Sequence, residues 1–149
     1  MQLTQHTDFG LRLLIVLARS ASGSIALPTF AAEQGLSYNH VAKVAQGLVR
    51  AGFISSQRGR NGGVTLARAP AELTVGEVVR ALEPGMRLAD CGRCGLRFDC
   101  ATSGVLSEAL AAFIAVLDRT TLEDAARRVP TAFAAASTGS PEEATAVNH

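Results

Sequence analysis

The three cysteines of this chain, Cys91, Cys94 and Cys100, all lie within one stretch of ten residues. Two glycines in that stretch allow a loop to turn around a centre, and Arg93 and Arg97 carry charge that stabilises thiolates. Thiolates are the ligands that soft metal centres prefer. The spacing C-x₂-C-x₅-C therefore favours a metal or cluster site over three unligated thiols.

Three thiolates leave a fourth ligand position open, to be filled by Asp, Glu, His, Ser, water or a group from elsewhere. Two alternatives use the same residues. Zinc binds thiolates in a tetrahedral site, and Cys91 with Cys94 can form a dithiol–disulfide switch. Spacing alone does not separate zinc from an iron–sulfur cluster.

A second set of chemically active side chains follows one face of a predicted helix, which has Ser37 as its N-cap and runs to about Ala51. Its apolar residues recur at helical spacing: Val41, Val44, Ala45 and Leu48. A helix in the major groove reads bases with its N-terminal and outward residues, where Asn pairs with adenine and Lys with guanine. The candidate DNA-contacting residues here are Ser37, Tyr38, Asn39, His40 and Lys43, with Arg50 placed for phosphate.

Two short β-prone runs, 53–57 and 64–68, flank the sequence RGRNGG, in which Asn-Gly is a hairpin-turn signal. Arg58 and Arg60 at its tip suit a narrow, electronegative minor groove. Upstream, 7–20 is predicted to be a helix capped by Thr7, and 27–35 a short helix. This order predicts a winged helix-turn-helix. The alternative is a generic three-helix domain with an incidental hairpin.

Downstream, residues 74–83 form a predicted fourth helix, and 102–118 a long helix with an apolar seam at steps of four and three. The seam residues are Leu106, Leu110, Phe113 and Leu117. A helix this apolar needs a partner, either a second subunit or its own domain, and we expect a homodimer. A short helix is predicted at 121–128. The predicted organisation is a DNA-binding domain (1–83), a cluster-binding loop (84–101), a dimerisation region (102–128) and a disordered tail (129–149), in a mainly α fold with a β-hairpin wing.

Charge is distributed unevenly. Residues 1–70 hold seven basic and two acidic side chains, and residues 71–149 hold seven basic and eleven acidic ones. This indicates a polyanion partner for the first part only. We expect no membrane span and no secretory signal, hence a cytoplasmic protein whose thiols stay reduced. No Ser/His/Asp constellation or phosphate-binding glycine loop indicates an enzyme.

Several separate motifs carry a family resemblance. They are MQLT (1–4), TDFGLR (7–12), YNHVAK (38–43), RGRNGGV (58–64) and the cysteine trio. Together they resemble the NsrR/IscR family of bacterial iron–sulfur winged-helix regulators, and within it the nitric-oxide-responsive NsrR branch, over roughly residues 1–125. The first two cysteines depart from the family pattern, in which the gap between them is longer.

The resemblance implies a homodimer that represses from a partly palindromic DNA operator while its cluster is intact, with [4Fe–4S] favoured over [2Fe–2S]. Nitric oxide would attack the cluster and release repression. The resemblance also implies that Asp8 of the other subunit supplies the fourth ligand. The IscR branch uses a His three residues after the last cysteine, where this chain has Ser103. An iron or cluster-status regulator and a zinc or thiol-redox protein are the alternative functions.

Overall fold

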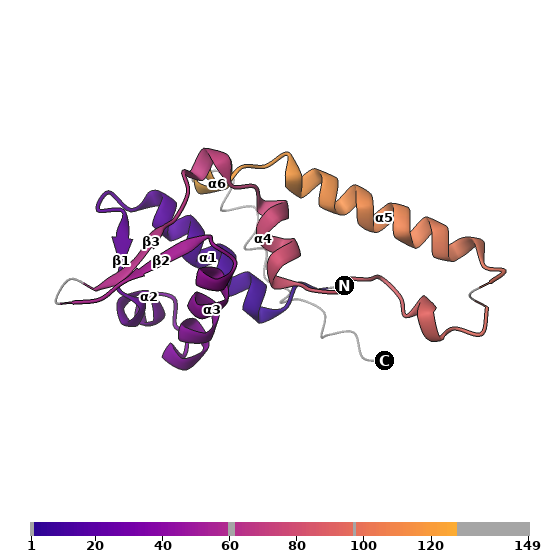
Figure 1. The fold of residues 1–149 in the computed structure, drawn as a ribbon, viewed down its shortest axis with the longest axis horizontal. Helices are drawn as coiled ribbons and strands as arrows, with labels where there is room; N and C mark the ends of the chain where they lie inside the picture. Colours follow the sequence, from indigo (N-terminus) through magenta and orange to yellow (C-terminus); the bar gives the residue numbers. More distant parts are fainter. Residues whose placement is uncertain (1, 60–61, 97, 128–149) are drawn as a thin grey trace, which may run out of the picture.

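The computed structural model describes residues 2–59, 62–96 and 98–127, and it divides into a helical domain and a projecting helix (Figure 1). The domain contains α1 (Gln5–Arg19), β1 (Ser24–Ile25), α2 (Leu27–Glu33), α3 (Tyr38–Arg50), β2 (Ile54–Gln57), β3 (Gly63–Leu66) and α4 (Val75–Leu82). The projecting part carries a 3₁₀ turn at Cys91–Arg93 and α5 (Ala101–Asp118), and α6 (Leu122–Ala126) returns to the domain.

The first helix begins earlier than its sequence indicates. Thr4, in extended backbone conformation, is the N-cap, and its hydroxyl accepts a hydrogen bond from the Thr7 amide at 3.3 Å. Thr7 is therefore inside the helix, where its side chain is completely buried. The prediction that Thr7 caps the helix was wrong, because the chain carries two cap-competent threonines three residues apart and the first one takes the role.

The helix-turn-helix is confirmed. Pro28 lies in the first turn of α2, where its missing N–H removes no helical hydrogen bond. Gly35, at φ +63°, makes the turn toward α3. The four apolar residues of α3 predicted to face the core are all buried: Val41, Val44, Ala45 and Leu48.

The wing is an antiparallel hairpin of β2 and β3, in register from Ile54 opposite Leu66 to Gln57 opposite Gly63. The two-residue strand β1 adds to the outer side of β3, giving the sheet order β1-β3-β2. Strand β1 was not predicted from the sequence, since two residues are too few to show an alternating pattern.

The C-terminal end of the projecting helix is fastened to the domain. The Leu122 amide donates to the Leu73 carbonyl at 2.7 Å, and the Val75 amide donates to the Thr120 carbonyl at 2.9 Å. Leu122 joins the buried core, and the Arg19 guanidinium donates to the Ala126 carbonyl at 2.8 Å. Helix α6, which the sequence analysis grouped with the dimerisation region, thus packs on the domain beside α1.

Helix α5 differs from every other long helix described, because none of its residues is buried. It rests against α4 at its C-terminal end, while its N-terminal end carries the cysteine loop away from the domain (Figure 1). Among the described residues, α5 is also the one helix long and apolar enough to cross a membrane by length and composition. Length and apolar composition alone do not indicate a membrane span, because a helix that packs against another protein chain can have both.

Candidate DNA-binding surface and cysteine loop

The outward face of α3 presents the residues expected to contact DNA. Ser37 is the N-cap, as predicted, and its hydroxyl makes no capping hydrogen bond to the described helix. The remaining candidates on this helix are also exposed: Tyr38, Asn39, His40, Lys43 and Arg50. Burial of the opposite face fixes the orientation of the helix, so these side chains share one accessible surface.

The basic side chains of this surface are free for a polyanion. Among the described residues, Lys43, Arg50 and Arg58 form no ion pair, whereas Arg68 and Arg80 each pair with a carboxylate. Arg58 is exposed next to the wing turn. The predicted contact of Arg60 lies outside the described residues. Unpaired cations beside an exposed helix face are the electrostatic footprint of a nucleic-acid surface.

A hollow of about 170 Å³ lies between the start of α1 and α3, beside the predicted base-reading residues. Gln5 and His6 line it together with His40 and Lys43. Sequence reasoning did not include Gln5 and His6 in this surface, because only the packing of α1 on α3 brings them there. Their polar side chains extend the surface onto the first helix.

The three cysteines occupy the far end of the projecting part. Cys91 and Cys100 are half-buried and Cys94 is exposed. Cys100 is the N-cap of α5, and the nearby backbone amides of Ser103 and Thr102 lower the pKa of its thiol. A thiol whose pKa is lowered at a helix N-terminus is a suitable soft ligand.

The donor set fits an iron–sulfur centre in its chemistry, with three thiols on one loop. Within the part of the chain that the structure describes, however, no group of three or more His, Cys, Asp or Glu side chains is already gathered around one metal position. Asp8, the predicted fourth ligand, forms a two-point ion pair with Arg12, at 2.6 Å and 3.1 Å. The isolated chain thus holds the donors without assembling them.

The predicted dimer seam is split between two hollows of this same chain. Leu106 and Leu110 line a hollow of about 380 Å³ against the cysteine loop, and Phe113 lines a second one. All four seam residues, including Leu117, are half-buried. The exposed large apolar side chains of α5 are Val105 and Val116, at 62% and 52%. Helix α5 consequently offers a second apolar row, which the sequence analysis did not assign.

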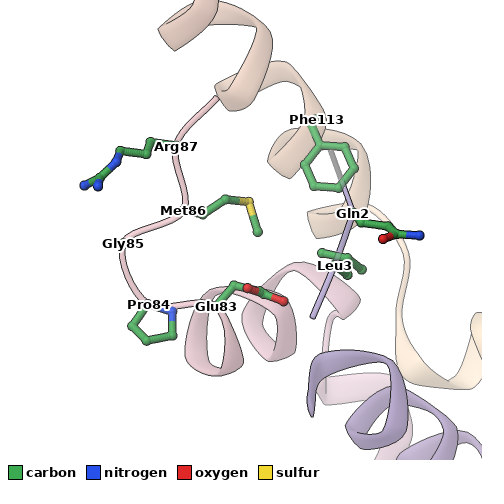
Figure 2. A pocket seen from close by; sticks show the side chains of 8 residues that line it. All are labelled: Gln2, Leu3, Glu83, Pro84, Gly85, Met86, Arg87 and Phe113. Carbon is green, nitrogen blue, oxygen red and sulfur yellow. The ribbon is translucent and has the colours of Figure 1, made fainter. Parts of the chain in front are cut away.

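The second hollow, of about 570 Å³, lies where the N-terminal segment, the end of α4 and α5 meet. Met86 and Phe113 point into it, while Arg87 points away (Figure 2). Glu83 on its wall accepts hydrogen bonds from the Thr4 amide at 2.6 Å and the Thr4 hydroxyl at 2.8 Å. This contact joins residues 79 positions apart, so no sequence pattern indicated it.

Comparison with known proteins gives consistent relatives. The family profile Rrf2, described as an iron-dependent transcriptional regulator, matches residues 3–128. The HTH-type transcriptional regulator NsrR of Halalkalibacterium halodurans is 41% identical over 130 residues, which cover 83% of this chain and 89% of that protein. The protein of the same name in Bacillus subtilis is 38% identical, with coverage of 83% and 89%.

Solved structures agree with these relatives. The oxidized form of Staphylococcus aureus CymR superposes with a TM-score of 0.73 at 30% identity, covering 87% of this chain and 99% of that one. The IscR of T. potens superposes with a TM-score of 0.69 at 26% identity, covering 89% and 96%. The winged-helix fold and the NsrR-like resemblance are thereby confirmed.

Proposed function

The chain belongs to the Rrf2 family of transcriptional regulators, and from this premise we propose that it is a homodimeric repressor that senses nitric oxide through an iron–sulfur cluster. The family makes the chain a DNA-binding regulator rather than an enzyme. The proposal goes beyond the family in five respects: the protein represses, responds to nitric oxide, binds a cluster, forms a dimer and is located in the cytoplasm.

One observation carries the proposal: a single chain combines an unpaired basic surface at α3 with three thiols confined to a loop at the opposite extreme of the molecule (Figure 1). A regulator needs a site that reads DNA and a separate site that reads a signal. The relatives named NsrR, 38–41% identical over most of the chain, favour nitric oxide over iron status as the signal.

The cluster-binding residues we assign are Cys91, Cys94 and Cys100 of one subunit and Asp8 of the other. When bound, a [4Fe–4S] cluster supplies iron with which nitric oxide reacts. A carboxylate oxygen binds iron less softly than thiolate, so Asp8 is the labile ligand. Asp8 is already oriented by Arg12 in this chain, and a second lone pair remains on each carboxylate oxygen for a metal.

The dimer contact is assigned to α5, since its surface is apolar and unburied within the chain. On DNA, Lys43 and Asn39 read the major groove, Arg50 holds a phosphate and the wing arginines Arg58 and Arg60 enter the minor groove. In a symmetric dimer the two α3 helices meet two half-sites, which matches a partly palindromic operator.

The function is tested by DNA binding in three states of one preparation. Duplexes selected from a random library with anaerobic protein provide the probe, and anisotropy gives the dissociation constant for the cluster-loaded, cluster-free and nitric-oxide-treated protein. We expect tight binding only in the loaded state. Equal affinity in all three states would contradict the proposed sensing, and tight binding by a zinc-loaded, iron-free protein would favour the zinc alternative.

The origin of the fourth ligand is tested with mixed dimers. One subunit carries Asp8→Ala, and the other carries Ala in place of Cys91, Cys94 and Cys100. If Asp8 acts across the dimer, the mixed dimer holds one complete site with the wild-type absorption spectrum and reactivity toward nitric oxide. If the spectrum instead matches that of the Asp8→Ala homodimer, the ligand comes from the same subunit or from another group.

A further inference from the structure

The N-terminal segment is held in place by a carboxylate that is distant in sequence, at the end of α4. Glu83 Oε1 accepts from both the amide and the hydroxyl of Thr4, at 2.6 Å and 2.8 Å. Burial acts to raise the pKa of Glu83, but the hydrogen bonds from Thr4 and Thr7 and the nearby His6 outweigh it, so the pKa is lowered. The carboxylate is therefore held charged, and charge-assisted hydrogen bonds are about twice as strong as neutral ones.

Glu83 is also the point where the cysteine loop begins. It is the C-cap of α4, and Pro84 and Gly85 follow it, the latter at φ +76°. Proline cannot continue the helix and glycine takes the left-handed conformation, so the chain leaves α4 at a fixed place. From Glu83 the loop runs directly past Met86, along the same cavity as Phe113 of α5 (Figure 2).

The residues next to Thr4 touch the recognition helix. His6 packs against Gly47 of α3, where an added Cβ would lie 3.1 Å from the imidazole Nε2. Gly47 lies four residues after Lys43 and three before Arg50, which places it between the two DNA-facing cations along the helix. The final residue of α4, Leu82, reaches the same place, since its Cδ2 is 3.8 Å from that Cβ position. A continuous line of contacts thus runs from Glu83 through Thr4 and His6 to α3.

We propose that Glu83 is the positioning residue that couples the cysteine loop to recognition helix α3 within each subunit. A shift of the loop pulls on Glu83, Glu83 moves the Thr4–His6 turn, and that turn changes how α3 is presented to DNA. The coupling rests on the proposed function, because it needs a loop whose state controls DNA binding. It has a defined physical route through bonded and packed groups.

The test compares the alanine variant of Glu83 with the alanine variant of another glutamate of α4. Glu83→Ala removes the contact with Thr4. Glu77→Ala is the control, because Glu77 lies on the same helix and binds Thr74 and Arg68 but nothing in α1. Each protein is assayed for iron per subunit, for operator affinity with and without the cluster, and for amide hydrogen exchange at Thr4 in the cluster-free form.

For Glu83→Ala we expect unchanged iron content, faster exchange at the Thr4 amide, and a ratio of cluster-free to cluster-loaded dissociation constants roughly tenfold smaller, within the range of about 5- to 150-fold typical of allosteric coupling. Glu77→Ala should keep the wild-type ratio even if it lowers stability. Thr4→Ser retains both donors, so it should keep the ratio as well and show that the fold tolerates change at this contact.

Two results overturn the inference in different ways. If the wild-type ratio is large and Glu83→Ala leaves it unchanged, the coupling is wrong and the proposed function stands. If the wild-type ratio is already one, the proposed sensing fails and the coupling fails with it. An equal loss of coupling in Glu77→Ala would show that helix stability, not the contact with Thr4, sets the ratio, and would also overturn the assignment.

Discussion

The winged-helix domain and the projecting part, called the arm from here on (the cysteine loop and α5), use apolar residues in opposite ways. Leu13, Leu14 and Leu48 of the domain are fully buried, whereas α5, with more apolar side chains than any other described helix, buries none. Burying a leucine contributes about 1.5–3 kcal/mol. The domain therefore contains its own stabilising core, whereas the apolar side chains of the arm stay partly or fully exposed to water.

The two regions also differ in charge. The candidate DNA-binding surface of the domain keeps Lys43 and Arg50 unpaired among the described residues, whereas Arg87 and Arg93 near the cysteines both lie within 4 Å of Asp90. The unpaired cations of the domain and the accessible apolar side chains and cysteine loop of the arm indicate where partners bind. On the proposed function, DNA would complete the first region, and a second subunit with a cluster would complete the other.

The largest effect is expected in the domain core. Leu14→Ala removes a fully buried side chain and should lower the free energy of unfolding by about 2–5 kcal/mol, measured by urea denaturation. The control is Leu96→Ala on the cysteine loop, where the side chain is 68% exposed and the change should stay within about 0.5 kcal/mol. Similar losses in both proteins would remove the contrast between domain and arm.

A charge in the arm should break the dimer while sparing the domain. Leu110→Glu places a carboxylate in the proposed seam and should reduce association by about 2 kcal/mol or more, lowering the sedimentation mass toward that of a monomer. Val105→Glu alters the other apolar row of α5. If Val105→Glu dissociates the dimer and Leu110→Glu does not, the contact uses the opposite face; a monomeric wild-type protein would end the dimer hypothesis.

The DNA surface should respond according to the role of each cation. Lys43→Ala should cost about 1–3 kcal/mol of operator affinity and relax base preference, because a base contact is lost. Arg50→Ala should weaken all sequences alike and reduce the salt dependence by about one phosphate contact. Unchanged affinity and preference in Lys43→Ala would show that α3 is not the reading helix.

The smallest effect is at the junction of the two regions. The hydrogen bond from Arg80 holds the pKa of Asp118 below its ordinary value of 3.8, and the two side chains form an ion pair at 2.8 Å. A lowered carboxyl pKa contributes stability above the ordinary value and loses it as the pH falls through the folded-state value. Between pH 7 and about pH 3, wild type should lose slightly more stability than Asp118→Asn, by urea midpoint. Parallel profiles would show that this pair does not stabilise the junction.

Most of the fold could be read from the sequence, because its signals are local. The helical spacing of Val41 and Leu48 and the glycine stops at Gly35 and Gly52 predict the helix-turn-helix that the structure contains. Strand β1 was missed, since its two residues pair only after the hairpin exists. Thr7 was misassigned because an earlier threonine, Thr4, is the N-cap and also donates a hydrogen bond to Glu83.

Less of the candidate site could be predicted from the sequence. Exposure of the α3 face follows from helix periodicity, which places Asn39 and Lys43 opposite the buried residues. The contacts of Thr4 with Glu83 and of His6 with Gly47 depend on packing between distant segments. The ion pair of Asp8 with Arg12 lies at helical spacing, and the sequence analysis did not foresee it.

The most direct test of the account is the metal content of the full chain purified without oxygen. Iron, acid-labile sulfide and zinc are measured together with the visible absorption spectrum, for wild type and for Ala at each of Cys91, Cys94 and Cys100. The account predicts a broad visible band with iron and sulfide in wild type, abolished in each cysteine variant. A colourless wild-type protein loaded with zinc, or full iron and sulfide in the Cys91→Ala protein, would contradict it.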